Sequence, residues 1–260
     1  MAIDPDLSSP EQFQAIQTQW SLVARAHRGS ADAVGQARNA LALRYRKAIR
    51  SYLGALLKDD SAADELAQDA IVRLLNGEFA SAAPDKGRFR NFLKVAVHNM
   101  ARSYWDQRKR RATVDVDPNR LGAFDPHEAD SCWIDDWRGT ILQAAWDLLK
   151  EYEKDHPGSL YYTLFKLRSE SPTTRSKELA IRLEAQTGQK VTAAAARQST
   201  RRARFLFANY LVEEIAKSLA EPTAEAVEEE LAELGLIKYV RDFMPADWRT
   251  NGMLLVDEHK

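Results

Sequence analysis

The stretch "DKGRFRNFLKVAVHNMARSYWDQRKRR", residues 85–111, combines apolar spacing typical of a helix with an excess of positive charge. Between residues 86 and 111 it holds nine Lys or Arg residues and one acid, Asp106, although the whole chain has a formal net charge of −1. Apolar residues recur at intervals of three and four, which predicts an amphipathic helix with one buried stripe. The predicted stripe consists of Phe89, Leu93, Ala96, Met100 and Tyr104.

The overall composition excludes several classes of protein. A chain of 260 residues, 45% of them hydrophobic, predicts one large domain or two small ones. No apolar run is long enough to span a bilayer, and the polar, acidic N-terminus resembles neither a signal nor a transit peptide. Cys132 is the only cysteine, so no intrachain disulfide can form, which fits a reducing compartment. We find no metal-ligand spacing, phosphate loop or nucleophile motif, and therefore expect no metal, no cofactor and no enzymatic activity.

Charge is distributed along the chain in blocks of alternating sign. Residues 86–111 carry a net charge of about +8, and residues 190–204 hold five cations and no acid. Residues 115–136 hold seven acids against one arginine, and residues 221–234 hold six Glu and no base. Such blocks are typical of a protein that binds a polyanion and separates its basic modules with acidic spacers.

Helical spacing along nearly the whole chain predicts an all-α fold, with two small helical domains, an acidic linker between them and a helical C-terminal tail. Ser61 is the expected N-cap of the third helix. Residues 112–132 contain prolines, a glycine and many acids, and we interpret them as the linker. The predicted helices cover roughly residues 10–26, 32–57, 61–76, 85–111, 134–154, 158–169, 176–187, 191–219 and 223–240.

The basic stretch at 85–111 has the chemistry needed to hold a single-stranded nucleic acid. Its guanidinium and ammonium groups can neutralise phosphates, while aromatic rings and arginine planes can stack on unpaired bases. A solvated basic face on an ordinary amphipathic helix would explain the same charge equally well. Charge alone therefore leaves both interpretations open.

A second basic block, "SKELAIRLEAQTGQKVTAAAARQSTRRARFLF" at 176–207, has the outline of a helix-turn-helix. Gly188 supplies a turn, Thr192 is placed to cap the following helix, and the alanines after it would allow a close approach of the backbone. Arginine can read guanine and glutamine can read adenine in the major groove, from the first turns of a recognition helix. The alternative is a plain Ala/Arg-rich surface helix.

Three segments in this order resemble sigma factors of the extracytoplasmic-function (ECF) type, in the sigma-70 superfamily. "ADELAQDAIVRLL" at 63–75 is similar to the acidic region 2 helix that docks on the clamp coiled coil of RNA polymerase. Residues 87–111 are similar to the adjoining helix that holds the melted −10 element. Residues 177–219 resemble the region 4 helix-turn-helix that reads the −35 element. The likeness covers about residues 15–219.

The resemblance implies a protein that binds core RNA polymerase and promoter DNA and helps to open the DNA, without covalent chemistry. It implies sigma region 2 at 10–111, an acidic linker at 112–132, region 4 at 133–219 and an acidic extension of open role at 220–260. The residues implied for polymerase binding are Asp64, Glu65, Gln68, Asp69 and Arg73; for the −10 single strand, Arg88, Arg90, Asn91, Lys94, Asn99, Arg102, Trp105 and Arg108; and for the −35 duplex, Thr192, Arg197, Gln198, Arg201 and Arg202.

Two alternatives to this function remain open at the level of sequence. One is a helix-turn-helix regulator that binds DNA without polymerase, and the other is a helical adaptor protein. The resemblance implies a cytoplasmic location, and it leaves open whether an anti-sigma factor, a regulatory kinase or the extension holds the protein inactive. The six Glu of 221–234 could cover the arginine face of 197–204 when DNA is absent, or form a solvated helix with no regulatory part.

Overall fold

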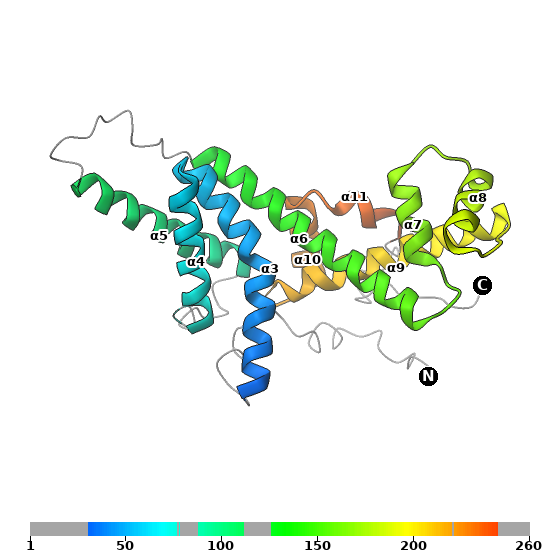
Figure 1. Ribbon diagram of the computed structural model, residues 1–260, viewed down its shortest axis with the longest axis horizontal. Coiled ribbons are helices and arrows are strands. Elements are labelled where there is room, and N and C mark those ends of the chain that lie inside the picture. The colour runs from blue at the N-terminus through cyan, green and yellow to red at the C-terminus, as the bar shows by residue number, and fades with distance from the viewer. Residues whose placement is uncertain (1–30, 77, 79–87, 112–125, 220, 244–260) are drawn as a thin grey trace. The chain divides into compact units, whose positions relative to one another are not determined.

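The computed structural model describes residues 31–76, 78, 88–111, 126–219 and 221–243 (Figure 1). Within these ranges the chain is all-helical, as predicted, and none of its helices has the length and apolarity needed to cross a bilayer. The α-helices are α3 (Ala31–Leu57), α4 (Asp60–Asn76), α5 (Phe89–Arg111), α6 (Pro126–Asp155), α7 (Tyr161–Glu170), α8 (Ser176–Thr187), α9 (Ala193–Lys217), α10 (Ala224–Glu233) and α11 (Ile237–Val240), followed by a 3-10 helix, η4 (Arg241–Phe243).

The described residues form two compact units. The N-terminal unit comprises residues 31–140 and 216–226, and the C-terminal unit comprises residues 141–215 and 227–243. The division falls within α6, between Thr140 and Ile141, rather than at the predicted boundary after residue 132. The predicted helix at 10–26 lies outside the described residues.

The acidic segment predicted as a linker is partly helical. Because α6 begins at Pro126, residues 126–132 belong to a helix, and α6 as far as Thr140 is part of the N-terminal unit. The reason is a buried stripe at four-residue spacing, made by Ala129, Trp133 and Trp137, each at most 1% exposed. Burial of two indoles on one helix face stabilises this packing. The acids lie on the other faces and stay near water, so they lose little hydration free energy.

Aromatic rings form the core of the N-terminal unit. In this unit α3 and α4 lie side by side as an antiparallel hairpin (Figure 1). The ring of Tyr45 on α3 stacks on Trp137 of α6, with centroids 4.9 Å apart, and Phe89 of α5 lies 5.3 Å from Tyr45. Seven residues after Tyr45 on α3, Tyr52 meets Trp133 edge-on at 5.5 Å. Rings from three helices thus interlock, which holds α5 and the first half of α6 against the hairpin.

The buried stripe of α5 differs from the predicted one. Phe89, Leu93, Val97 and Ala101 are fully buried, at a constant spacing of four residues. The predicted members Ala96, Met100 and Tyr104 are only half-buried. The prediction of a helix with one apolar face is confirmed, but the face is rotated because α5 presents its four-residue ridge to the core.

In the C-terminal unit, α7, α8 and the start of α9 share an apolar cluster. Gly188 adopts φ 73°, in the left-handed region that favours glycine, and its N–H donates to the Glu184 carbonyl at 2.8 Å, which ends α8. Val191 packs on the cluster and leads the chain into α9. The buried members of the cluster are Leu160, Leu164, Leu179, Ala180, Leu183 and Ala196.

The described part of the C-terminal extension, residues 221–243, is packed rather than free. The predicted helix at 223–240 is present as α10 and α11, separated by a turn in which Gly235 has φ 66°. The ring of Phe243 in η4 meets that of Phe205 in α9 edge-on, with centroids 6.5 Å apart. Five apolar residues of its described part are fully buried, namely Val227, Leu231, Leu234, Leu236 and Val240, and so is Glu230.

Candidate nucleic-acid interface

The five residues predicted to meet polymerase all lie on the outer side of α4. Its inner side is buried through small and apolar residues such as Ala63 and Leu66. Asp64, Glu65 and Gln68 are exposed, and Asp69 accepts a hydrogen bond from Arg73 Nε at 3.1 Å on the same helix. The structure therefore brings the predicted set together on one accessible, mainly acidic surface.

One further residue of this surface was missed by the sequence reasoning. Val72 is 45% exposed and lies one turn after Gln68 and two turns after Glu65. An exposed β-branched residue among carboxylates can supply apolar contact at the centre of a charged interface. Val72 could have been predicted from the sequence, because it follows Gln68 by four residues and Glu65 by seven and so shares their helix face.

The accessible face of α5 carries three of the eight residues predicted for the −10 strand. Asn91 and Asn99 are exposed at a spacing of eight residues, with Val95, which is 59% exposed, midway between them. Arg102 is exposed on the following turn, whereas Arg88 and Trp105 are half-buried. Amide and guanidinium groups at this spacing can hydrogen-bond to bases and phosphates along one strand.

Two of the predicted DNA-binding cations are engaged in ion pairs within the N-terminal unit. Lys94 Nζ lies 2.8 Å from Asp130 Oδ1 on α6, and Arg108 Nη1 lies 2.6 Å from Asp59 Oδ2 before α4. Neither Lys94 nor Arg108 is buried, so phosphates could reach them only in competition with these carboxylates.

Arg90 does not fit the predicted role. Its side chain is only 2% exposed, so it presents no accessible cation to a nucleic acid. Arg90 directly follows Phe89, and a rotation of about 100° per residue places it on the same side of α5 as Val97 and Ala101 of the buried stripe. The prediction was based on the charge of Arg90 and did not consider the helix face on which the side chain lies.

A second basic face lies on the first turns of α9, in the C-terminal unit. Thr192 Oγ1 accepts the N–H of Ala195 at 3.1 Å and so caps α9 as predicted. The buried side of α9 is formed by Ala196, Thr200, Ala203 and Phe207. The five predicted −35 residues are all exposed: Thr192, Arg197, Gln198, Arg201 and Arg202.

Residues 41–111, which include α4, α5 and most of α3, match the family Sigma-70 region 2. This part of the chain is therefore identified as a sigma-70 region 2 domain. A search of curated proteins and a search of solved structures each found no match. The predicted resemblance is thus confirmed for region 2, at residues 41–111.

The match to region 2 includes both helices, α4 and α5, that carry the residues predicted for polymerase and the −10 strand. A sigma factor with this domain binds core RNA polymerase and recognises the −10 element in transcription initiation. The sigma factor family is non-catalytic, which confirms the expectation that the chain is not an enzyme. In the described part of the chain, no group of His, Cys, Asp and Glu residues could hold a metal ion.

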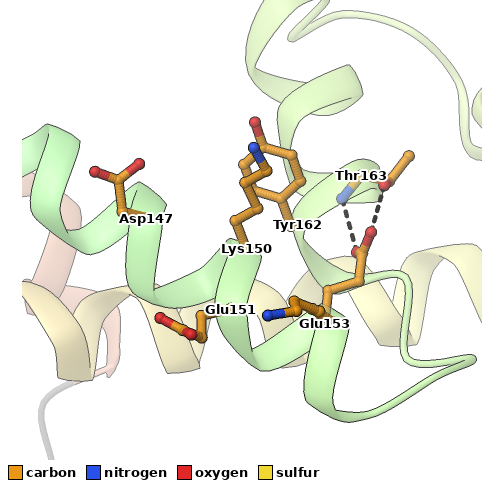
Figure 2. Close-up of a pocket in the computed structure, with 7 residues that line it drawn as sticks. Asp147, Lys150, Glu151, Glu153, Tyr162 and Thr163 are labelled. Atoms are coloured by element: carbon orange, nitrogen blue, oxygen red, sulfur yellow. Dashed lines mark hydrogen bonds between the residues drawn. The ribbon is translucent and has the colours of Figure 1, made fainter.

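A cavity of about 550 Å³ is lined by none of the site residues predicted from the sequence. It is found in the C-terminal unit, where α6 meets α7 (Figure 2). Glu153 accepts hydrogen bonds from the Thr163 backbone N–H at 2.9 Å and from its hydroxyl at 2.6 Å, which ties the start of α7 to the end of α6. The lining is of mixed charge and consists of Asp147, Lys150, Glu151, Glu153, Lys154, Tyr162 and Thr163.

Proposed function

We propose that the protein is a sigma factor of the ECF type that recognises two promoter elements, the −10 element through region 2 and the −35 duplex through the first turns of α9. The observation that carries the proposal is the second basic face. Its arginines and glutamine are exposed on a helix that follows a short turn and begins with a capping threonine. Helix N-terminal turns with Arg and Gln are the part of a recognition helix that meets base edges.

The shared core of α7, α8 and α9 supports a helix-turn-helix. Leu179 and Leu183 of α8 are in one apolar cluster with Ala196 of α9, so α8 braces the helix that would enter the groove. Small residues at 193–195 leave room for the DNA backbone near the cap, where N–H groups favour phosphate. In this arrangement Arg197, Gln198, Arg201 and Arg202 contact bases or phosphates, and Thr192 lies near a phosphate.

Within region 2, we assign polymerase binding to the outer side of α4 and strand binding to the exposed face of α5. Asn91, Asn99 and Arg102 contact the strand in this proposal, and Arg88 and Trp105 border its path. Flipping a base out of a duplex costs a few kcal/mol, while one stacking contact returns about 1–3 kcal/mol. Region 2 alone therefore cannot melt several base pairs, and anchoring at −35 and on polymerase supplies the remainder.

The accessibility of the arginine face supports the alternative in which the six Glu of 221–234 do not cover it. Arg197, Arg201 and Arg202 are exposed although α10 and α11 are present and packed. We propose that the protein acts in the cytoplasm, and that any inhibitor, whether an anti-sigma factor or a kinase-controlled partner, is a separate protein.

Footprinting with reconstituted holoenzyme tests the two-element proposal. On a promoter mapped by run-off transcription, Arg201→Ala should weaken protection of the −35 duplex by about 1–3 kcal/mol, the value of a bidentate base contact. Lys238→Ala, which removes one positive charge from α11 in the same unit, should leave protection unchanged. Equal effects of the two variants, or protection confined to the −10 region, would contradict a −35 role for α9.

The same experiment separates the alternatives. A helix-turn-helix regulator would protect its site without core polymerase, and an adaptor protein would show no salt-dependent DNA binding in either condition. The region 2 domain favours the first proposal over both, because polymerase binding is the function of that domain.

A further inference from the structure

The connection between α3 and α4 is a two-residue junction, Lys58-Asp59, that contacts four helices of the N-terminal unit: α3, α4, α5 and α6. Lys58 has φ 52°, in the left-handed region that non-glycine residues seldom adopt, and its N–H donates to the Gly54 carbonyl of α3 at 3.0 Å. The Lys58 ammonium forms an ion pair with Glu128 of α6. The tight reversal brings Asp59 to the start of α4.

Asp59 is the N-cap of α4, a role expected from the sequence for Ser61. Its Oδ1 accepts the N–H of Ala62 at 3.1 Å, and its backbone carbonyl accepts the N–H of Ala63 at 2.9 Å. These bonds define where the helix with the polymerase-binding surface begins.

The second carboxylate oxygen of Asp59 reaches a different helix. Asp59 Oδ2 lies 2.6 Å from Arg108 Nη1, near the C-terminal end of α5, and the two side chains are 29% and 37% exposed. The hydrogen bond from Ala62 and then that from Arg108 lower the pKa of Asp59, so the carboxylate remains charged at neutral pH. One side chain therefore fixes both the start of α4 and the position of the end of α5.

We propose that Asp59 is a positioning residue for promoter opening: it holds Arg108, and with it the exposed face of α5, in a fixed relation to the polymerase-binding helix α4. This inference rests on the proposed assignment of α4 to polymerase and of α5 to the −10 strand. Arg108 then serves as the partner of Asp59 rather than as a contact to phosphate.

Two variants separate positioning from direct DNA contact. Asp59→Asn keeps a good N-cap but removes the charge opposite Arg108, and Arg108→Gln leaves the cap untouched. Holoenzyme carrying each variant is titrated with the single strand that covers the −10 element of a mapped promoter, at several salt concentrations. Asp60→Asn is the matched control, because Asp60 is 84% exposed and its carboxylate pairs with Arg50 instead.

If Asp59 is a positioning residue, each variant should weaken strand binding by up to about fivefold, the factor that corresponds to the loss of a partly exposed ion pair. The double variant should bind the strand no more weakly than either single variant. It also predicts an unchanged salt slope and unchanged assembly with core polymerase. Tighter strand binding by Asp59→Asn would overturn the inference, as would a slope reduced by about 0.7 in Arg108→Gln, since either result makes Arg108 a phosphate contact.

Strand binding equal to wild type in both variants would also overturn the inference, while leaving the proposed function intact. Failure of the wild-type holoenzyme to bind the strand would instead refute the proposed function. If Asp59→Asn does not fold, Arg108→Gln decides the question, because it alters neither the cap nor the junction.

Discussion

Release of Lys94 from its internal partner should strengthen binding of single-stranded DNA. Lys94 Nζ lies 2.8 Å from Asp130 Oδ1, with 28% of the lysine and 52% of the aspartate side chain exposed. Such a partly exposed pair contributes about 0.2–1 kcal/mol. Asp130→Asn removes the competing charge, so affinity for a strand that contacts Lys94 should rise by a factor of about 1.4–5.

The release of Lys94 should also change how the affinity for the strand depends on salt concentration. If Lys94 gains a phosphate, the slope of log K against log salt should become steeper by about 0.7 for a single strand. Fluorescence anisotropy of a labelled oligonucleotide of about 12 nucleotides, titrated at several KCl concentrations, measures both quantities.

A matched variant on the same helix removes the same charge without touching α5. Asp135 is 63% exposed and pairs with Arg138 three residues later. Asp135→Asn therefore reports the general effect of one lost negative charge. The reasoning is refuted if Asp130→Asn binds no more tightly than Asp135→Asn, or if its salt slope does not change.

Three further outcomes follow from the same structure. Trp137→Ala should reduce the free energy of unfolding by about 3–5 kcal/mol, measured by urea denaturation, because the indole is 1% exposed and stacked on Tyr45; a loss under 0.5 kcal/mol would mean that α6 does not dock there. Glu65→Arg should impair co-elution with core polymerase while leaving the urea midpoint within error, since the side chain is exposed; normal assembly would remove α4 from the interface. The pKa of Asp59 is lowered from 3.8 first by the Ala62 hydrogen bond and then by Arg108, so its stabilising contribution is complete above the unfolded pKa and is lost as the pH falls through the folded one. Between about pH 5 and pH 2, wild type should therefore lose more stability than Asp59→Asn, and parallel pH profiles would argue against the ion pair.

Helices whose ends carry local signals could be predicted closely from the sequence. The bounds of α8 match the prediction because Gly188 adopts the left-handed conformation that stops a helix. The threonine cap of α9 is equally local, since Thr192 bonds to a backbone group three residues away. In contrast, Asp59 was missed as the cap of α4 because Ser61, two residues later, is an equally good capping type.

The start of α6 could not be predicted from composition, because its acids and Pro126 are also typical of a linker. The decisive feature was the spacing of Ala129, Trp133 and Trp137, which a search for four-residue periodicity would have detected. Whether that stripe packs on the preceding helices depends on tertiary contacts with Tyr45 and Tyr52, which no local pattern reveals.

The candidate site shows the same division between local and tertiary information. The five α4 residues and the five residues of 192–202 could be predicted to lie on accessible faces, because the spacing of apolar residues shows which face of an amphipathic helix is exposed. It could not tell that Lys94 and Arg108 are ion-paired, because Asp130 and Asp59 lie far from them along the chain. Charge was therefore predictable, whereas its availability to DNA was not.

Reconstitution with core RNA polymerase tests the central claim most directly. Purified protein is mixed with core enzyme, passed over a sizing column and then supplied with genomic fragments and nucleotides for run-off transcription. A sigma factor should co-elute with the core enzyme and yield RNA that begins at defined start sites, and Glu65→Arg should reduce both. A chain that elutes apart from the core enzyme and yields no start-site-specific RNA would contradict it.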